Sequence, residues 1–193
     1  MKKKLPGENP SQRTESMDIP VRKSNTLLYF VLRFAVMFLL FEACYFNDYL
    51  YTHVFFPVNK LFAFATAKTL TWFGIAATST LSSVQNEIFS MEVRQGCDSI
   101  EALAIFVCGV LAFPASVKSK VSGLLIGSSV ILLMNLIRLV HLFWLGVYRN
   151  DLFELFHLEI WQGFFIILSI VLWILWVLNA VKPTKPTKPI VNA

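Results

Sequence analysis

Cys97 is the residue best placed for covalent chemistry, because it stands where a polar stretch meets an apolar one: residues 95–113 read QGCDSIEALAIFVCGVLAF. Asp98 and Glu101 have the Asp-x-x-Glu spacing of a capping box, which predicts a helix that begins at or just after Asp98. The unpaired N–H groups of a helix start favour a thiolate. The two carboxylates oppose that effect when they are ionised. A nearby cation is therefore needed to make Cys97 a thiolate.

Arg138, in the apolar stretch NLIRLVHLFW, is the obvious source of that positive charge. At about 4 to 6 Å and an effective dielectric near 20, one cation is worth roughly 3 to 4 kcal/mol, or about two to three pKa units. An arginine in such a run either extends its side chain to the interface or meets a protein partner. Asn135 and His141 fall on the same helical face, which favours a protein-lined site.

The acid/base role has three histidine candidates. His53 lies in an aromatic loop, where an interfacial position is expected. His141 shares a face with Arg138. His157 falls in a predicted short outer connection, near three carboxylates that could hold its imidazole in one tautomer. Those carboxylates are Asp151, Glu154 and Glu159. The residues alone leave the role open between His141 and His157.

Cysteine, guanidinium and imidazole together can perform acyl transfer, in which the thiolate attacks a carbonyl and the imidazole moves the proton. Secondary candidates for the same site are His141, Asn135 and Glu101. The sequence predicts no cofactor: the Cys and His spacings do not suit a metal, and no Gly-rich phosphate loop is present.

The composition indicates a membrane protein, because 56% of the 193 residues are hydrophobic and only 15% are charged. We expect an all-α polytopic fold with four transmembrane helices, at about 27–46, 99–115, 121–144 and 160–181. Residues 57–77 predict an interfacial or re-entrant helix, with a true span as the alternative. A short extracytoplasmic extended segment is expected before Cys97. The predicted domains are a disordered basic cytoplasmic N-terminus (1–26), a membrane-embedded domain (27–181) and a basic Pro-rich cytoplasmic tail (182–193).

The net charge of +5 reports orientation rather than nucleic-acid binding, because the basic residues gather at the two ends and in the loop 116–120. Placing these three segments in the cytoplasm puts Cys97, Arg138 and His157 on the outer side of the bilayer. Residues 47–98 must then cross the membrane an even number of times.

Other interpretations of single residues stay open at this stage. Cys44 ends the first span on the outer side, so a Cys44–Cys97 disulfide is an alternative. Arg33 and Glu42 interrupt the first span at a separation of about 13 Å along one helix, so each needs another partner. A non-enzymatic transport or assembly subunit that uses these charges is the alternative function.

The order of these features resembles the exosortase/archaeosortase family of membrane cysteine transpeptidases. The resemblance covers about residues 57–170 and rests on PVNKLFAFATAKTLTWFGIAA, EIFSMEV, GCDSIEAL, NLIRLV and FHLEIWQG. It implies Cys97 as the nucleophile, Arg138 as its stabiliser and His157 rather than His141 as the acid/base. The family typically shows Cys-Ser-Gly or Cys-Thr-Gly where this chain has Cys97-Asp98-Ser99, and many members are longer.

The resemblance also implies a substrate and a location. The substrate would be an exported protein with a C-terminal transmembrane sorting signal, processed through a thioacyl intermediate by hydrolysis or transpeptidation. The enzyme would be a multi-pass protein of the cytoplasmic (inner) membrane with an extracytoplasmic active site, in contact with the lipid bilayer and with no nucleic acid.

Overall fold

Three long apolar helices dominate the computed structural model, which describes residues 23–181. They are α1 (Lys23–Tyr45), α5 (Val117–Tyr148) and a continuous helical run made of α6 (Asn150–Glu154), η2 (Leu155–Ile160) and α7 (Trp161–Ala180). Each is long and apolar enough to cross a membrane. Of the predicted terminal segments, residues 1–22 and 182–193 lie outside the described residues.

The fourth predicted span is a shorter apolar helix, α4 (Ile100–Ala112). Its 13 residues reach about 20 Å, against about 30 Å for the hydrocarbon core. The expectation of four full-length spans is therefore corrected to three long helices and one short one. α4 ends at Ala112 because Phe113 is extended (φ −73°, ψ 137°) in front of Pro114, where the α conformation is disfavoured.

The last two predicted spans are longer than the sequence indicated. α5 has 32 residues, and Ser116 caps it by accepting a hydrogen bond from the Ser119 N–H at 3.3 Å. Residues 150–160, predicted as a short outer connection, are helical and continue directly into α7. His157 therefore lies on a helix, within the π-helical turn η2, rather than on a loop.

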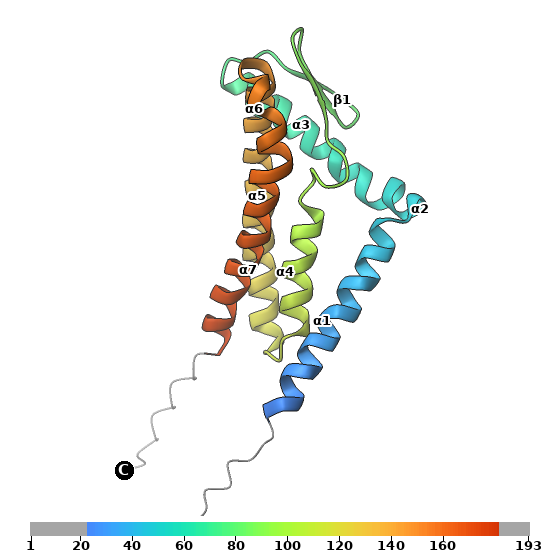
Figure 1. The fold of residues 1–193 in the computed structure, drawn as a ribbon, viewed down its shortest axis with the longest axis vertical. Helices are drawn as coiled ribbons and strands as arrows, with labels where there is room; N and C mark the ends of the chain where they lie inside the picture. The colour runs from blue at the N-terminus through green and yellow to red at the C-terminus, as the bar shows by residue number, and fades with distance from the viewer. Residues whose placement is uncertain (1–22, 182–193) are drawn as a thin grey trace, which may run out of the picture.

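Residues 48–72 form three consecutive helical segments: α2 (Asp48–Leu50), the π-helical turn η1 (Tyr51–Phe55) and α3 (Phe56–Trp72). α3 is not among the described helices that are long and apolar enough to span a membrane. It runs obliquely across one end of the long helices (Figure 1). This arrangement favours the interfacial or re-entrant interpretation of residues 57–77 over a true span.

A small antiparallel sheet stands between α3 and Cys97, so the fold is mostly helical rather than all-α. Its strands are β1 (Thr78–Thr80), β2 (Ser83–Gln85) and β3 (Ser90–Glu92), in the order β1-β2-β3. Val84 pairs with Ser79 on one side and with Met91 on the other. The extended segment expected before Cys97 is thus the second hairpin of this sheet.

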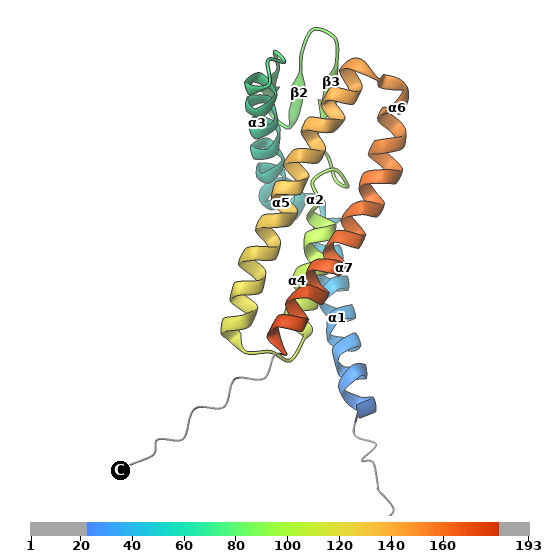
Figure 2. The ribbon, with the colours of Figure 1, turned by 90° about the vertical axis from the view of Figure 1, so that its left-hand side faces the viewer.

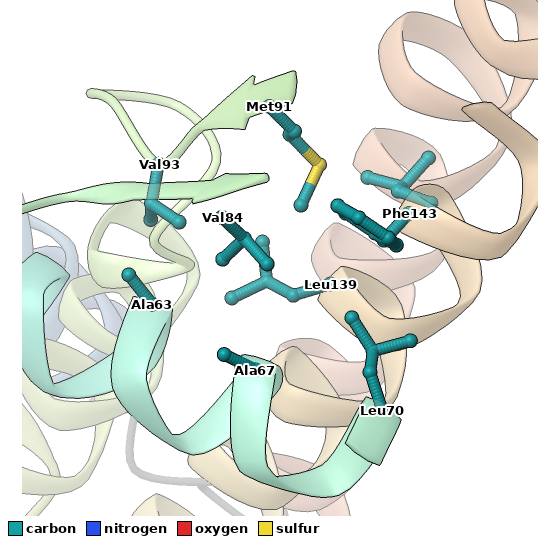
Figure 3. Close-up of a cluster of buried hydrophobic side chains, with 9 residues drawn as sticks. Ala63, Ala67, Leu70, Val84, Met91, Val93, Leu139 and Phe143 are labelled. Carbon is teal, nitrogen blue, oxygen red and sulfur yellow. The ribbon is translucent and has the colours of Figure 1, made fainter. Parts of the chain in front are cut away.

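Two apolar clusters hold these elements together. The first packs α3 and the sheet against α5, as Figure 3 shows, and includes Leu139, the neighbour of Arg138. Its other members are Ala63, Ala67, Leu70, Val84, Met91, Val93, Leu142 and Phe143. The second joins α4, α5 and α7 and contains Ala102, Phe106, Val110, Ile131 and Phe165. The two clusters thus hold α5, which carries Arg138, and α4, which begins three residues after Cys97.

The ends of the helices separate into two groups (Figures 1 and 2). The start of α1, the α4–α5 turn and the end of α7 lie at one end, α6 and the sheet lie at the other, and α2 lies between the two ends. α4 lies between α1 on one side and α5 and α7 on the other (Figure 1). Lys118 and Lys120, in the first turn of α5 just after the α4–α5 turn, therefore lie at the opposite end from the sheet.

Candidate active site

Cys97 lies in the connection between β3 and α4, and backbone conformation shapes this connection. Gly96 has φ +82°, and Ser99, the N-cap of α4, has φ +57°. The left-handed region costs a non-glycine residue roughly 1 to 2 kcal/mol. Ser99 stands where the resembling family typically has glycine, so this chain places a strained residue two positions after Cys97.

The predicted capping box is not formed, although the helix begins close to where it was expected. The Asp98 carboxylate accepts a hydrogen bond from the Ile100 N–H at 3.1 Å, and α4 begins at Ile100. The Cys97 N–H donates to the Arg94 carbonyl at 2.9 Å, within a turn that precedes the helix. Cys97 therefore lies outside the first turn of α4, and its thiol gains less from the helix dipole than the sequence suggested.

Tyr45, at the end of α1, holds the Cys97 loop from the side. Its fully buried hydroxyl lies 2.9 and 3.0 Å from the two carboxylate oxygens of Asp98 and donates to that group. The same oxygen accepts a hydrogen bond from the Gly96 N–H at 3.3 Å. Gln95 adds a bond from its amide nitrogen to the Tyr45 carbonyl at 2.9 Å. Tyr45 thus contacts the residues on both sides of Cys97.

The Cys97 thiol faces the imidazole of His157. Its Sγ lies 3.4 Å from Nε2 and 3.6 Å from Nδ1, so either nitrogen is within hydrogen-bond distance of the sulfur. Phe153 stacks on the imidazole at 5.4 Å between ring centroids, which limits the rotation of the ring. Cys97 is 8% exposed, and His157 is partly buried.

Arg138 connects the cysteine loop to the histidine helix. Its guanidinium donates to the Gly96 carbonyl at 3.3 Å and to the His157 carbonyl at 3.4 Å. It also lies 5.6 Å from the centroid of the Phe165 ring. Only 2% of Arg138 is exposed, so its side chain meets protein partners instead of reaching the interface. The guanidinium is therefore both a structural bridge and the nearest buried positive charge to the thiol.

Burial decides the protonation of Cys97. Loss of solvent raises the pKa of its thiol, the Arg138 guanidinium lowers it, and the Asp98 carboxylate raises it again. The net shift in the pKa is upward, which favours a neutral thiol at rest over the thiolate that the sequence predicted. Burial likewise raises the pKa of Asp98 to about 6, because its hydrogen bonds offset only part of the desolvation. The site at rest therefore holds a neutral thiol beside a guanidinium.

The other predicted site residues lie around this cluster. The His141 Nδ1 accepts a hydrogen bond from the Trp161 Nε1–H at 3.2 Å, and its ring packs on Phe156 and Trp161. Asn135 is fully buried, and its amide has no hydrogen-bond partner among residues 23–181. Glu101 lines a cavity beside the Cys97 loop.

Two sequence expectations about neighbours of the site are not met. No carboxylate hydrogen-bonds to the His157 imidazole within the described part of the chain, and Asp151 pairs instead with Arg149 at 3.1 Å. All three cysteines are free thiols, so Cys44 and Cys97 are not bridged. The role of Tyr45 was missed, because a tyrosine at a helix end is ordinary in a membrane protein and carries no local signal of this contact.

The fold and the cluster define a class: a multi-pass helical membrane protein in which a buried cysteine, an imidazole and a guanidinium meet near one end of the helices. The chain matches the model of the transmembrane exosortases over residues 26–177 and belongs to that family. Members are cysteine transpeptidases, so membership implies, at the level of the family, the processing of sorting signals. No curated protein and no solved structure matched the chain.

Proposed function

We propose that this chain is a membrane-embedded cysteine transpeptidase or protease that cleaves the C-terminal sorting signal of an exported protein through a thioester on Cys97. Family membership supports the reaction class. The observation that carries the proposal is the contact of the Cys97 sulfur with the His157 imidazole at 3.4 Å, between segments 60 residues apart in the chain. The guanidinium of Arg138, hydrogen-bonded to both segments, supports the same assignment.

The proposed reaction begins from a neutral thiol. As the Cys97 sulfur forms a bond to the substrate carbonyl carbon, its proton passes to the His157 imidazole. The carbonyl oxygen becomes an oxyanion, and Arg138 stabilises its charge. The carbon–nitrogen bond then breaks, and the imidazolium returns the proton to the leaving amine. An acceptor amine or water resolves the resulting thioester.

The sidedness of the reaction is part of the proposal. The cluster lies toward the end of the helices that carries the sheet, away from the basic α4–α5 turn (Figure 1). Because basic loops remain in the cytoplasm, this end faces outward. An exported protein would therefore meet Cys97 after it has crossed the bilayer.

A matched pair of histidine variants tests the assignment of roles. Cys97→Ala and His157→Gln should each lower processing of a cognate exported protein by at least about a thousandfold, since nucleophile and base act as a unit. His141→Gln, which can still accept from Trp161, should process at close to the wild-type rate. Immunoblots of the substrate and of the enzyme in membranes give both readouts. Normal processing by Cys97→Ala, with the variant present at wild-type levels, would exclude this chemistry.

A further inference from the structure

A cavity of about 250 Å³ lies beside the Cys97 loop, with walls from α1, α4 and α7. Its polar lining consists of Glu42, Asp98, Ser99, Glu101, Arg138 and Gln162. Phe38, Phe165 and aliphatic side chains close the rest. At about 30 Å³ per water, this space equals roughly eight water molecules, which suits a side-chain-sized group.

The lining is unbalanced in charge, because three carboxyl groups face one guanidinium. Glu42 and Glu101 lie close enough to interact electrostatically. Neither carboxyl group has a hydrogen bond or an ion pair with any residue in the range 23–181. A carboxyl group within a membrane span is costly unless it is paired, and its persistence indicates a functional partner. The partner that the cavity lacks is therefore a cation.

Two residues that line the cavity also hold buried polar atoms without partners. Ser99 is 5% exposed and Arg138 is 2% exposed. Among the described residues, neither the Ser99 hydroxyl nor the Arg138 Nε–H has a hydrogen-bond partner. Buried polar atoms without partners are rare. The hydroxyl can accept from an ammonium, and Nε–H can donate to a carbonyl of the same bound molecule.

We propose that this cavity binds a positively charged group, an ammonium or a guanidinium, of a molecule that reacts at Cys97. A metal ion fits less well, since no group of three or more His, Cys, Asp or Glu residues within 23–181 is arranged to hold one. The identity of the reacting molecule rests on the proposed function. The preference of the cavity for a cation does not rest on the proposed function, because it can be measured without turnover.

Two sources could supply the cation: the acceptor amine or a basic side chain of the processed protein. In the first case a cavity carboxylate takes one proton from the ammonium, and the free amine attacks the thioester carbon. The new carbon–nitrogen bond replaces the carbon–sulfur bond. The second proton passes from the nitrogen to the departing Cys97 sulfur, which restores the thiol.

The cation preference is tested with charged thiol reagents on the full chain in detergent. In a Cys44→Ser, Cys108→Ala background, Cys97 is the only thiol. Its reaction rates are measured with the cationic aminoethyl and the anionic sulfonatoethyl methanethiosulfonate. The ratio of the two rates is compared with the same ratio for free cysteine. The cationic reagent should be favoured about tenfold or more relative to free cysteine, because charged cavities concentrate counter-ions. Glu42→Gln and Glu101→Gln, on different helices, should each reduce this ratio several-fold.

Glu87→Gln is the matched control, because Glu87 is exposed in the β2–β3 turn and does not line the cavity. It should leave the ratio unchanged. The proposal would be overturned if the ratio of cationic to anionic reagent rates in the wild type equalled that of free cysteine. It would also be overturned if Glu87→Gln lowered this ratio as much as Glu42→Gln and Glu101→Gln do. Neither result bears on whether Cys97 is the nucleophile, which the Cys97→Ala processing assay decides separately.

A turnover assay with added ethylenediamine distinguishes the two sources. If the acceptor supplies the cation, Glu42→Gln lowers the ratio of amine transfer to hydrolysis. If the processed protein supplies it, Glu42→Gln slows that release. In both cases, transfer of the acyl group to hydroxylamine, which is uncharged, is the reference for transfer to the charged ethylenediamine. Unchanged release and unchanged partition in both carboxylate variants would contradict the proposal.

Discussion

At the level of single residues, the main lesson concerns the Cys97 thiol. The sequence predicted a thiolate, because a helix start and a neighbouring guanidinium both favour the anionic sulfur. The structure buries the sulfur, and desolvation has a larger effect than the guanidinium. The sequence located the residues that meet but could not give the burial of the sulfur, which depends on the packing of α4, α5 and η2 around it.

The raised pKa of Cys97 predicts its reactivity. With Cys97 as the only thiol, the midpoint of the pH–rate profile for iodoacetamide should lie above the ordinary thiol pKa of about 8.5. Arg138→Gln should move the midpoint further upward, because it removes the charge that most favours the thiolate. Arg138→Lys, which keeps the charge, should move it less. A midpoint below the ordinary value, or a downward move in Arg138→Gln, would contradict this account.

Asp98 makes stability depend on pH. Its pKa is raised from 3.8 to about 6, so its neutral form favours the folded state, and that contribution is lost as pH rises through about 6. The shift corresponds to about 3 kcal/mol. Asp98→Asn should remove this part of the pH dependence. Relative to the variant, the wild type should therefore unfold several degrees lower at pH 7.5 than at pH 4.5, as measured by thermal unfolding in detergent.

A wild-type melting temperature that changes with pH as that of Asp98→Asn does would show that Asp98 keeps its ordinary pKa.

Tyr45→Phe offers a second measurement on the same network. It removes the hydroxyl that bonds Asp98 and Gly96 while keeping the ring. Because the loop then loses its support from α1, we expect slower processing with little change in the amount of folded protein.

At the level of elements, hydropathy located the long helices and missed their ends. The span predicted at 121–144 falls within α5, and those predicted at 27–46 and 160–181 fall largely within α1 and α7. The helical course of residues 150–160 was missed, because its polar residues resemble a loop when neighbouring helices are unknown. The sheet was reduced to one extended segment, since its three-residue strands are too short for a period-two pattern.

Close packing between α4 and α5 should be visible in a pair of glycine variants. A Cβ on Gly127 of α5 would overlap the Phe106 ring of α4, whereas a Cβ on Gly163 of α7 meets nothing within 4 Å. Gly127→Ala should therefore destabilise the fold by about 1 to 3 kcal/mol, the usual cost of overpacking. Gly163→Ala should be neutral or stabilise by up to about 1 kcal/mol, from better helix propensity.

Chemical denaturation in mixed micelles measures both glycine variants against the wild type. Equal effects of the two substitutions would mean that the approach of α4 to α5 is not as close as the structure has it. A processing defect confined to Gly127→Ala is also expected, because α4 carries the Cys97 loop at its start.

At the level of the whole molecule, the arrangement of the ends bears on the parity problem in the sequence. α3 runs across one end of the long helices and is not among the described helices long and apolar enough to span a membrane, which favours the prediction that residues 47–98 start and finish on the same side. The terminal ends of α1 and α7 and the α4–α5 turn share the opposite side. The positive charge of Lys118 and Lys120 at the start of α5 predicts that this side is cytoplasmic.

Cysteine labelling in intact cells tests the orientation. In a chain with all three native cysteines replaced, Ile88→Cys in the exposed β2–β3 turn should react with a membrane-impermeant maleimide. Lys118→Cys, at the other end, should react only after permeabilisation. The opposite pattern would place the Cys97 end in the cytoplasm, where it could not meet an exported protein after translocation.

The most direct test of the central claim is the intact mass of the enzyme during processing of a cognate exported protein. The account predicts an adduct on Cys97 equal to the N-terminal part of that protein, released by hydroxylamine as expected for a thioester and absent in Cys97→Ala. Processing that continues in Cys97→Ala, or that runs at the wild-type rate with the adduct on another residue, would contradict it.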